Sequence, residues 1–299
     1  MVSHLRLAAC LRTATAVAIC LSLVSVSNLE AAGRSKAKKK KVTSHLTLDP
    51  SAKSVELFDA IESGEIQAVV IPKDSKHGNV LFENKTDEPL TVQLPEAFVA
   101  VHTLKQFGGG GFGGGGQGGF GGGGQGGGGG GQSAGGGFGG GGQGGGGGQF
   151  GGGGGGGLFS VPSEKIVRVP YQSVCLEHGK KEPNSKMRYR LIPVETYTEN
   201  PVLRELITIV GTRRLNSEAI GSAQAATWHV TNKMSWQELA AKSKSKLNGF
   251  IPYFSQRQLL VAQSVVSTAF GRAQEKAARV AEESDKESDN PRSSRRSAG

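Results

Sequence analysis

Cysteine, aromatic residues and long apolar runs are all scarce in this chain. Its 299 residues include three cysteines, Cys10, Cys20 and Cys175, and aromatic residues make up 6% of the total. A fold held together by several disulfides is therefore excluded. The longest apolar run is about 14 residues, whereas a bilayer core requires about 20. We therefore expect no transmembrane segment in the mature chain.

The apolar run has the surroundings of a secretory signal peptide. Arg6 and Arg12 precede the run, which covers Thr13–Val26, and small residues follow it. This order predicts a cleaved signal peptide over residues 1–32. We therefore expect a secreted or cell-envelope protein whose mature chain keeps Cys175 as its single cysteine.

Positive charge is concentrated at the N-terminus. The net charge is +10, and eight of the 35 Lys and Arg residues lie in the first 41 positions. Residues 33–48 are predicted to form a disordered basic arm, which fits either a solvated spacer or a contact with an anionic wall polymer or membrane. Nucleic-acid binding would call for a basic folded face or aromatic platforms, and the sequence favours neither.

Glycine dominates residues 108–157. This segment holds 39 of the 48 glycines, and its remaining residues are Gln, Phe, one Ser and one Ala. Such a segment offers few side chains to bury and loses much backbone entropy on ordering. We therefore predict a disordered low-complexity loop inserted between two strands, one that can be deleted without loss of the fold.

Short β-rich runs lie on both sides of the glycine segment. Asp49-Pro50 is predicted to open a short helix that ends at Gly64. Alternating or β-branched runs with turn residues between them then predict strands at residues 66–71, 80–82, 90–94 and 98–101, and at 158–161 and 166–176 after the glycine segment. Together, residues 49–107 and 158–197 are typical of an antiparallel β-sandwich or partial barrel.

The apolar period becomes helical from residue 198 onward. Four helices are predicted: one after Pro201, one capped by Asn216, one opened by the capping box Ser235–Glu238, and one from Phe254 to about Glu283. Residues 198–283 therefore form a small helical domain, and residues 284–299 a disordered tail. The predicted fold class is α+β, with strands first and helices second.

One pair of short segments could carry chemistry. Cys175 and His178 lie at the end of a predicted strand, and Gln224, Trp228 and His229 lie on the second predicted helix. One interpretation makes Cys175 a small buried apolar residue and Trp228 a core anchor. Another makes Cys175, His178 and His229 a metal or Cys/His catalytic site, although a structural zinc site needs a fourth ligand.

The same residues resemble the thioester domains of bacterial surface adhesins. Val174-Cys175-Leu176 and Ala223-Gln224-Ala-Ala-Thr227-Trp228 are similar to the two motifs of that family, although Ala223 and Thr227 stand where stronger hydrophobes are usual. The resemblance implies an internal thioester between Cys175 and Gln224, formed with loss of ammonia, that a nucleophile on a target surface would open.

A broader likeness covers about residues 66–255 without the glycine segment. There the chain resembles secreted planctomycete proteins of unassigned function, through Cys-Leu-Glu-His-Gly-Lys, Gln-Ala-Ala-x-Trp-His and Ser-Trp-Gln-Glu-Leu. The expected function is that of an exported, non-enzymatic surface or matrix protein with a binding or structural role. No cofactor, metal or catalytic residue is assigned, and a Cys/His enzyme or metal-binding protein is the alternative.

Overall fold

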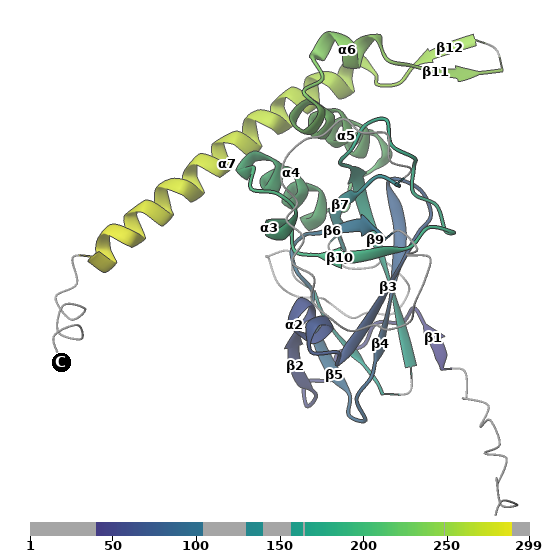
Figure 1. Ribbon diagram of the computed structural model, residues 1–299, viewed down its shortest axis with the longest axis vertical. Coiled ribbons are helices and arrows are strands. Elements are labelled where there is room, and N and C mark those ends of the chain that lie inside the picture. Colours follow the sequence, from purple (N-terminus) through teal and green to yellow (C-terminus); the bar gives the residue numbers. More distant parts are fainter. Residues whose placement is uncertain (1–39, 104–129, 140–156, 164, 248, 289–299) are drawn as a thin grey trace, which may run out of the picture. The chain divides into compact units, whose positions relative to one another are not determined.

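A computed structural model describes residues 40–103, 130–139, 157–163, 165–247 and 249–288 (Figure 1). The predicted signal peptide, most of the glycine segment and the end of the tail lie outside these residues. The fold is α+β, as predicted: a β-barrel is followed by a helical region. Among the described helices, none is long and apolar enough to cross a bilayer.

Six antiparallel strands close into the barrel. The order of pairing is β9-β4-β3-β10-β6-β7, and β7 pairs back with β9. These strands are β3 (Ile66–Pro72), β4 (His77–Asn84), β6 (Phe98–His102), β7 (Ala134–Gly137), β9 (Lys165–Cys175) and β10 (Tyr189–Ile192). The closure is short at two places: β10 meets β3 only at Tyr189 and Val70, and β7 pairs with four residues of β9, Gln172–Cys175.

Strand β7 comes from the glycine segment, so the prediction of a disordered loop is wrong for Ala134–Gly137. Its residues Ala134–Gly137 are buried and join β6 to β9. A Cβ on Gly136 would overlap the Gln172 carbonyl oxygen, and one on Gly137 would overlap the Cα of Gly211. Glycine is needed here because the neighbouring main chains approach too closely for a side chain, a requirement that composition alone does not reveal.

A second, three-stranded sheet packs at one end of the barrel. It consists of β2 (Lys53–Glu56), β5 (Leu90–Gln93) and β8 (Leu158–Val161), with the short helix α2 (Leu57–Glu62) beside it. The predicted helix start at Asp49-Pro50 is wrong, because Lys53–Glu56 pair with β5 as a strand. The helix begins only at Leu57, where the Glu56 carboxylate accepts hydrogen bonds from the amides of Phe58 and Asp59.

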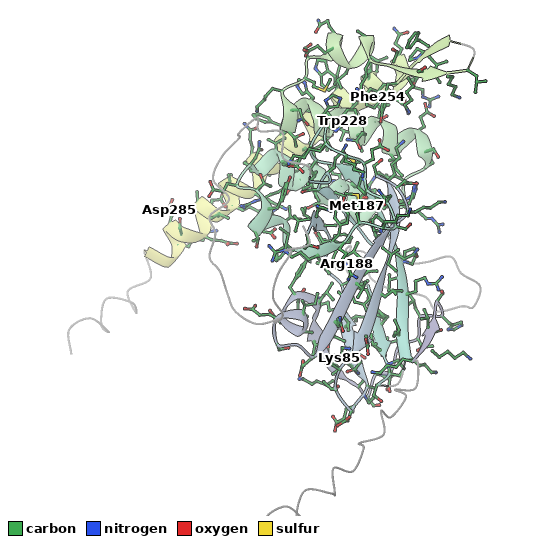
Figure 2. The ribbon with its side chains drawn as sticks, turned by 45° about the vertical axis from the view of Figure 1, so that its right-hand side comes forward. Lys85, Met187, Arg188, Trp228, Phe254 and Asp285 are labelled. Carbon is green, nitrogen blue, oxygen red and sulfur yellow. The ribbon has the colours of Figure 1, made fainter. Side chains whose placement is uncertain are left out.

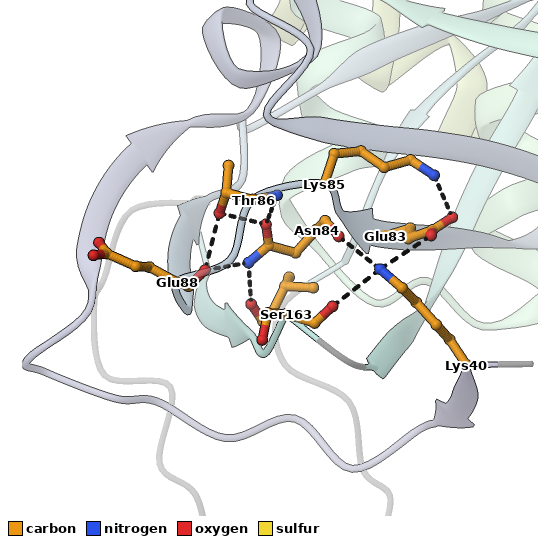
Figure 3. A network of polar contacts seen from close by, with 8 residues as sticks. Lys40, Glu83, Asn84, Lys85, Thr86, Glu88 and Ser163 are labelled. Carbon is orange, nitrogen blue, oxygen red and sulfur yellow. Dashed lines mark hydrogen bonds and ion pairs between the residues drawn. The ribbon is translucent and has the colours of Figure 1, made fainter. Parts of the chain in front are cut away.

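Polar contacts hold this end of the barrel together (Figure 3). The side chain of Asn84 is fully buried and donates to the carbonyl oxygens of Glu88 and Val161, at 2.7 and 2.9 Å. Lys40 donates to the carbonyls of Asn84 and Ser163 and pairs with Glu83 at 3.2 Å. The end of the predicted disordered arm is therefore ordered, and Lys41–Thr43 form strand β1, parallel to β9.

The four predicted helices are present in order: α4 (Pro201–Thr212), α5 (Ser217–Asn232), α6 (Trp236–Ala241) and α7 (Gln256–Ser288). A short helix that was not predicted, α3 (Val194–Tyr197), precedes them within residues assigned to the β domain. The predicted cap of Asn216 on α5 and the capping box of α6 are both present. An unpredicted hairpin, β11 (Ser243–Lys246) and β12 (Gly249–Pro252), lies between α6 and α7.

Helices α4 and α5 cover the outer face of the barrel next to β7 and β9. Val174 and Leu176 of the β9 end pack there with Ile207 of α4 and Ile220 of α5. The far side of α5 packs against α6 and α7 in a separate cluster around Trp228. Helix α5 is therefore buried between the barrel and the outer helices, and its residues 220–228 are all buried.

Candidate functional site

The candidate site begins where β9 ends, at Cys175. On one edge of β9, Cys175 lies opposite Ala134 of β7, and the next amide, Leu176, donates to the Ser133 carbonyl at 2.9 Å. On the other edge, β4 pairs with β9 only as far as His77 and Gln172. The main chain of Cys175 therefore lies beyond the end of its neighbouring strand, where its amide and carbonyl need another partner.

Gln224 of α5 supplies that partner. The Cys175 amide donates to Gln224 Oε1 at 2.8 Å, and Gln224 Nε2 donates to the Cys175 carbonyl, also at 2.8 Å. Both residues are 2% exposed. The primary amide thus takes the place of a neighbouring strand and ties α5 to the end of β9.

The thiol of Cys175 has a different environment from its main chain. Since Val174 and Leu176 face the helices, the alternation of a strand directs the Cys175 side chain to the other face. Its Sγ lies 3.9 Å from the Ser75 carbonyl oxygen, the acceptor of its hydrogen bond. Burial raises the pKa of this thiol to about 12, so it stays protonated at neutral pH.

His178 lies three residues further on and is held by three contacts. Its amide donates to Asn232 Oδ1 at 3.0 Å, its Nε2 lies 2.8 Å from Lys242 Nζ, and its ring packs edge-on against Trp228. Burial and the Lys242 ammonium lower the pKa of His178. The neutral imidazole therefore accepts a hydrogen bond from Lys242.

His229 is engaged elsewhere. Its Nδ1 lies 2.7 Å from the Met234 carbonyl oxygen, and its ring stacks on Trp236 with the centroids 4.2 Å apart. The structure thus brings Gln224 onto Cys175 and His178 onto Trp228, whereas His229 has partners of its own. Within the described ranges, no group of three or more His, Cys, Asp and Glu side chains could hold a metal ion.

Trp228 is the buried anchor that the sequence predicts. It is 5% exposed and packs against Tyr253 and Phe254, with ring centroids 5.5 and 5.7 Å away. Trp228 and Phe254 are labelled near the top of Figure 2. The ammonium of Lys242 lies 5.5 Å from the centre of its ring. Trp228 therefore links α5 to the segment that carries the hairpin.

The basic side chains of this cluster were missed at the level of sequence. Lys242 and Lys244 both lie over the ring of Tyr253, at 5.3 and 3.9 Å from its centre. The signal was present in Lys242-Ser-Lys244-Ser-Lys246, since an alternation with period two places all three lysines on one face of a strand. A polar alternation without apolar partners does not ordinarily predict a strand.

Comparison of the chain with protein families, curated proteins and solved structures gives no match. The arguments for its function therefore come from the arrangement of its own residues.

Proposed function

We propose that this chain is an exported, non-enzymatic protein of the cell surface or extracellular matrix, with a structural or binding role. The observation that carries the proposal is the pairing of Gln224 with the main chain of Cys175. Cys175 and Gln224 are the pair that the sequence marks as a candidate for a reaction, and in the structure their hydrogen bonds join the helical region to the barrel. Export rests on the signal-peptide pattern of residues 1–32.

The other candidate residues support the same reading. The thiol of Cys175 is buried with a raised pKa, which disfavours the thiolate that nucleophilic attack requires. The imidazoles of His178 and His229 are bonded to Lys242 and to the Met234 carbonyl. Each of these groups contributes to packing or hydrogen bonding in the fold, which accounts for their presence without a reaction.

A Cys175–Gln224 thioester is the second candidate, favoured by the position of the Gln224 amide directly against Cys175. In that step, Sγ would bond to Cδ of Gln224, the Cδ–Nε2 bond would break, and the thiol proton would leave with the nitrogen as ammonia. The thiol would first have to leave the Ser75 carbonyl, and the amide would have to give up both of its bonds to Cys175. An amine on a target surface would then open the thioester, releasing the thiol.

Fractionation of the producing cells tests the proposal. We expect the protein in the envelope or medium, shortened at its N-terminus, with any attachment released by salt and detergent and unchanged in Cys175→Ala. Retention of the full-length chain in the cytoplasm would contradict export. Attachment that survives denaturant and is lost in Cys175→Ala or Gln224→Ala would instead establish the thioester, as would a methylamine adduct with the same dependence. Release of a metal by chelation, with dependence on His178, would favour the Cys/His alternative.

A further inference from the structure

The hairpin β11–β12 is exposed on every described residue. Ser243–Lys246 and Gly249–Pro252 form a two-stranded sheet that pairs with none of the other strands described. Three large apolar side chains are solvent-exposed at or near its tip: Leu247 fully, Phe250 to 78% and Ile251 to 40%. Isolated exposed apolar residues are common, but three together at the end of one hairpin indicate an interaction site.

The charge of the hairpin is of one sign. Pairing of Lys244 with Ile251 and of Lys246 with Gly249 places these two lysines on one face, and Lys242 continues the same alternation. They are spaced by about 7 Å, two residues of a strand. No acidic residue occurs between Glu238 and Glu275 in the sequence. Lys76 and Glu182 are close enough to influence the charge on Lys244, so one further cation and one carboxylate lie beside this face.

The apolar and basic groups of the hairpin follow one another from the turn toward the body. Leu247 lies in the turn, Lys246 pairs with Gly249 beside it, and Phe250 comes next, opposite Ser245 and therefore on the other face from the lysines. Lys244 and Lys242 lie progressively closer to the body, over Tyr253 and Trp228. A tip of this kind can insert into a soft apolar phase while the lysines reach anionic groups at its boundary. An aromatic ring at the base, such as that of Tyr253, suits the same boundary.

We propose that the β11–β12 hairpin is a membrane-docking element that inserts Leu247 and Phe250 into the surface of an anionic lipid bilayer. The lysines alone would fit any polyanion, including nucleic acid or an acidic polysaccharide. The aliphatic and aromatic tip selects lipid, because a hydrated polyanion offers no apolar phase in which to bury Leu247 and Ile251. The inference goes beyond the proposed function, and vesicle binding depends neither on export nor on the state of Cys175.

Sedimentation of the full-length protein with lipid vesicles tests the inference. We expect binding to vesicles of equimolar phosphatidylglycerol and phosphatidylcholine, and much weaker binding to phosphatidylcholine alone. The double variant Leu247→Ser/Phe250→Ser should weaken binding by about tenfold or more. Its matched control, Leu260→Ser/Phe270→Ser, removes two side chains of α7 with exposures of 61% and 53%, and should bind as the wild type does.

The charge is tested separately. Lys244→Gln/Lys246→Gln should weaken binding and flatten its dependence on salt, whereas Lys165→Gln/Lys286→Gln, two exposed lysines outside both the hairpin and the basic arm, should not. Phe250→Cys, made together with Cys10→Ser and Cys20→Ser, can be labelled with an environment-sensitive fluorophore because the remaining Cys175 is buried. Its emission should shift to the blue on addition of anionic vesicles.

Three results would overturn the inference. One is equal binding to neutral and anionic vesicles, and another is an equal loss of binding in the α7 control. The third is tight binding to heparin or DNA that the tip variant retains, which would make the hairpin a site for a soluble polyanion. Circular dichroism of each variant shows whether a loss of binding reflects unfolding. Only a variant that loses binding and remains folded bears on the inference.

Discussion

Gln224 holds the main chain of Cys175 through two hydrogen bonds of 2.8 Å, one accepted and one donated by the same side-chain amide. The arrangement resembles the exchange of bonds between paired strands, but one partner is a helical side chain. It lies where β4 no longer accompanies β9, so it continues the pairing of the barrel into the helical region.

Replacement of Gln224 should therefore be costly for the stability of the fold. Gln224→Ala leaves a buried donor and a buried acceptor on Cys175 without partners, and we expect a loss of about 2–5 kcal/mol in the free energy of unfolding. Cys175→Ala keeps the main chain and its two bonds, and should lose only about 1–2 kcal/mol. Chemical denaturation of the two variants measures both, and an equal or reversed order would contradict the structural role of the amide.

The glycines of β7 give a second prediction. Gly136→Ala brings a Cβ onto the main chain of β9, and we expect it to destabilise the fold by about 2 kcal/mol or more. Gly157→Ala is the matched control from the same segment, because the nearest atom to its Cβ, Leu94 Cδ1, is 3.7 Å away. Thermal melting should show a clear fall for the first variant and little change for the second. Equal midpoints would mean that β7 does not close the barrel.

Trp228 joins α5 to the segment after β9 and to the residues just before α7, so its removal should destabilise several parts of the fold. Trp228→Ala takes away contacts with His178, Tyr253 and Phe254, and we expect a loss of about 3–5 kcal/mol. Trp236→Ala should lose less, because Trp236 is only partly buried and stacks mainly on His229. Denaturation monitored by the remaining tryptophan distinguishes the two, and a smaller loss for Trp228 would contradict its role as an anchor.

Stability should depend on pH through His178. Its folded-state pKa lies below the ordinary value of 6.5, so the unfolded chain binds the proton more tightly. The contribution of this group is therefore fully present above pH 6.5 and is lost as the pH falls through the lowered pKa. We expect the melting midpoint to fall on acidification below that pH, with a smaller slope in His178→Gln. The exposed His45→Gln is the control and should keep the wild-type slope.

Local sequence patterns were sufficient for the starts of α4, α5 and α6. Pro201, Asn216 and the Ser235–Glu238 capping box mark helix starts because caps and first turns depend on a few neighbouring residues. The start of α2 was misplaced because Asp49-Pro50 has the same chemistry as a helix cap. There, tertiary pairing of Lys53–Glu56 with β5 decides the conformation.

Strand β7 and the hairpin β11–β12 were not predictable in the same way. Ala134–Gly137 carry almost no side chains, so their strand conformation comes from the close approach of β6 and β9 rather than from a pattern. The hairpin alternates Ser with Lys and lacks a buried face. The conformation of such elements depends on the residues packed around them or on an external partner, and the local sequence pattern reveals neither.

The sequence predicted which residues of the candidate site lie together, but not which of their atoms are in contact. The motifs around Cys175 and Gln224 predicted that these residues meet, and they do. The sequence could not show that the pairing of β4 with β9 ends before Cys175. Because the Cys175 amide and carbonyl have no partner among the described strands on that edge, the Gln224 amide binds them instead of the thiol. The thiol faces the Ser75 carbonyl instead.

The intact mass of the mature protein, measured together with its thiol content, tests the central claim most directly. If Gln224 acts as a structural partner of Cys175, the mass equals that of the processed sequence. One thiol per chain then becomes reactive only on denaturation, since burial keeps its pKa near 12 in the folded state. A mass lower by one ammonia, with no thiol after denaturation in the absence of added nucleophiles, would contradict the account and establish a thioester.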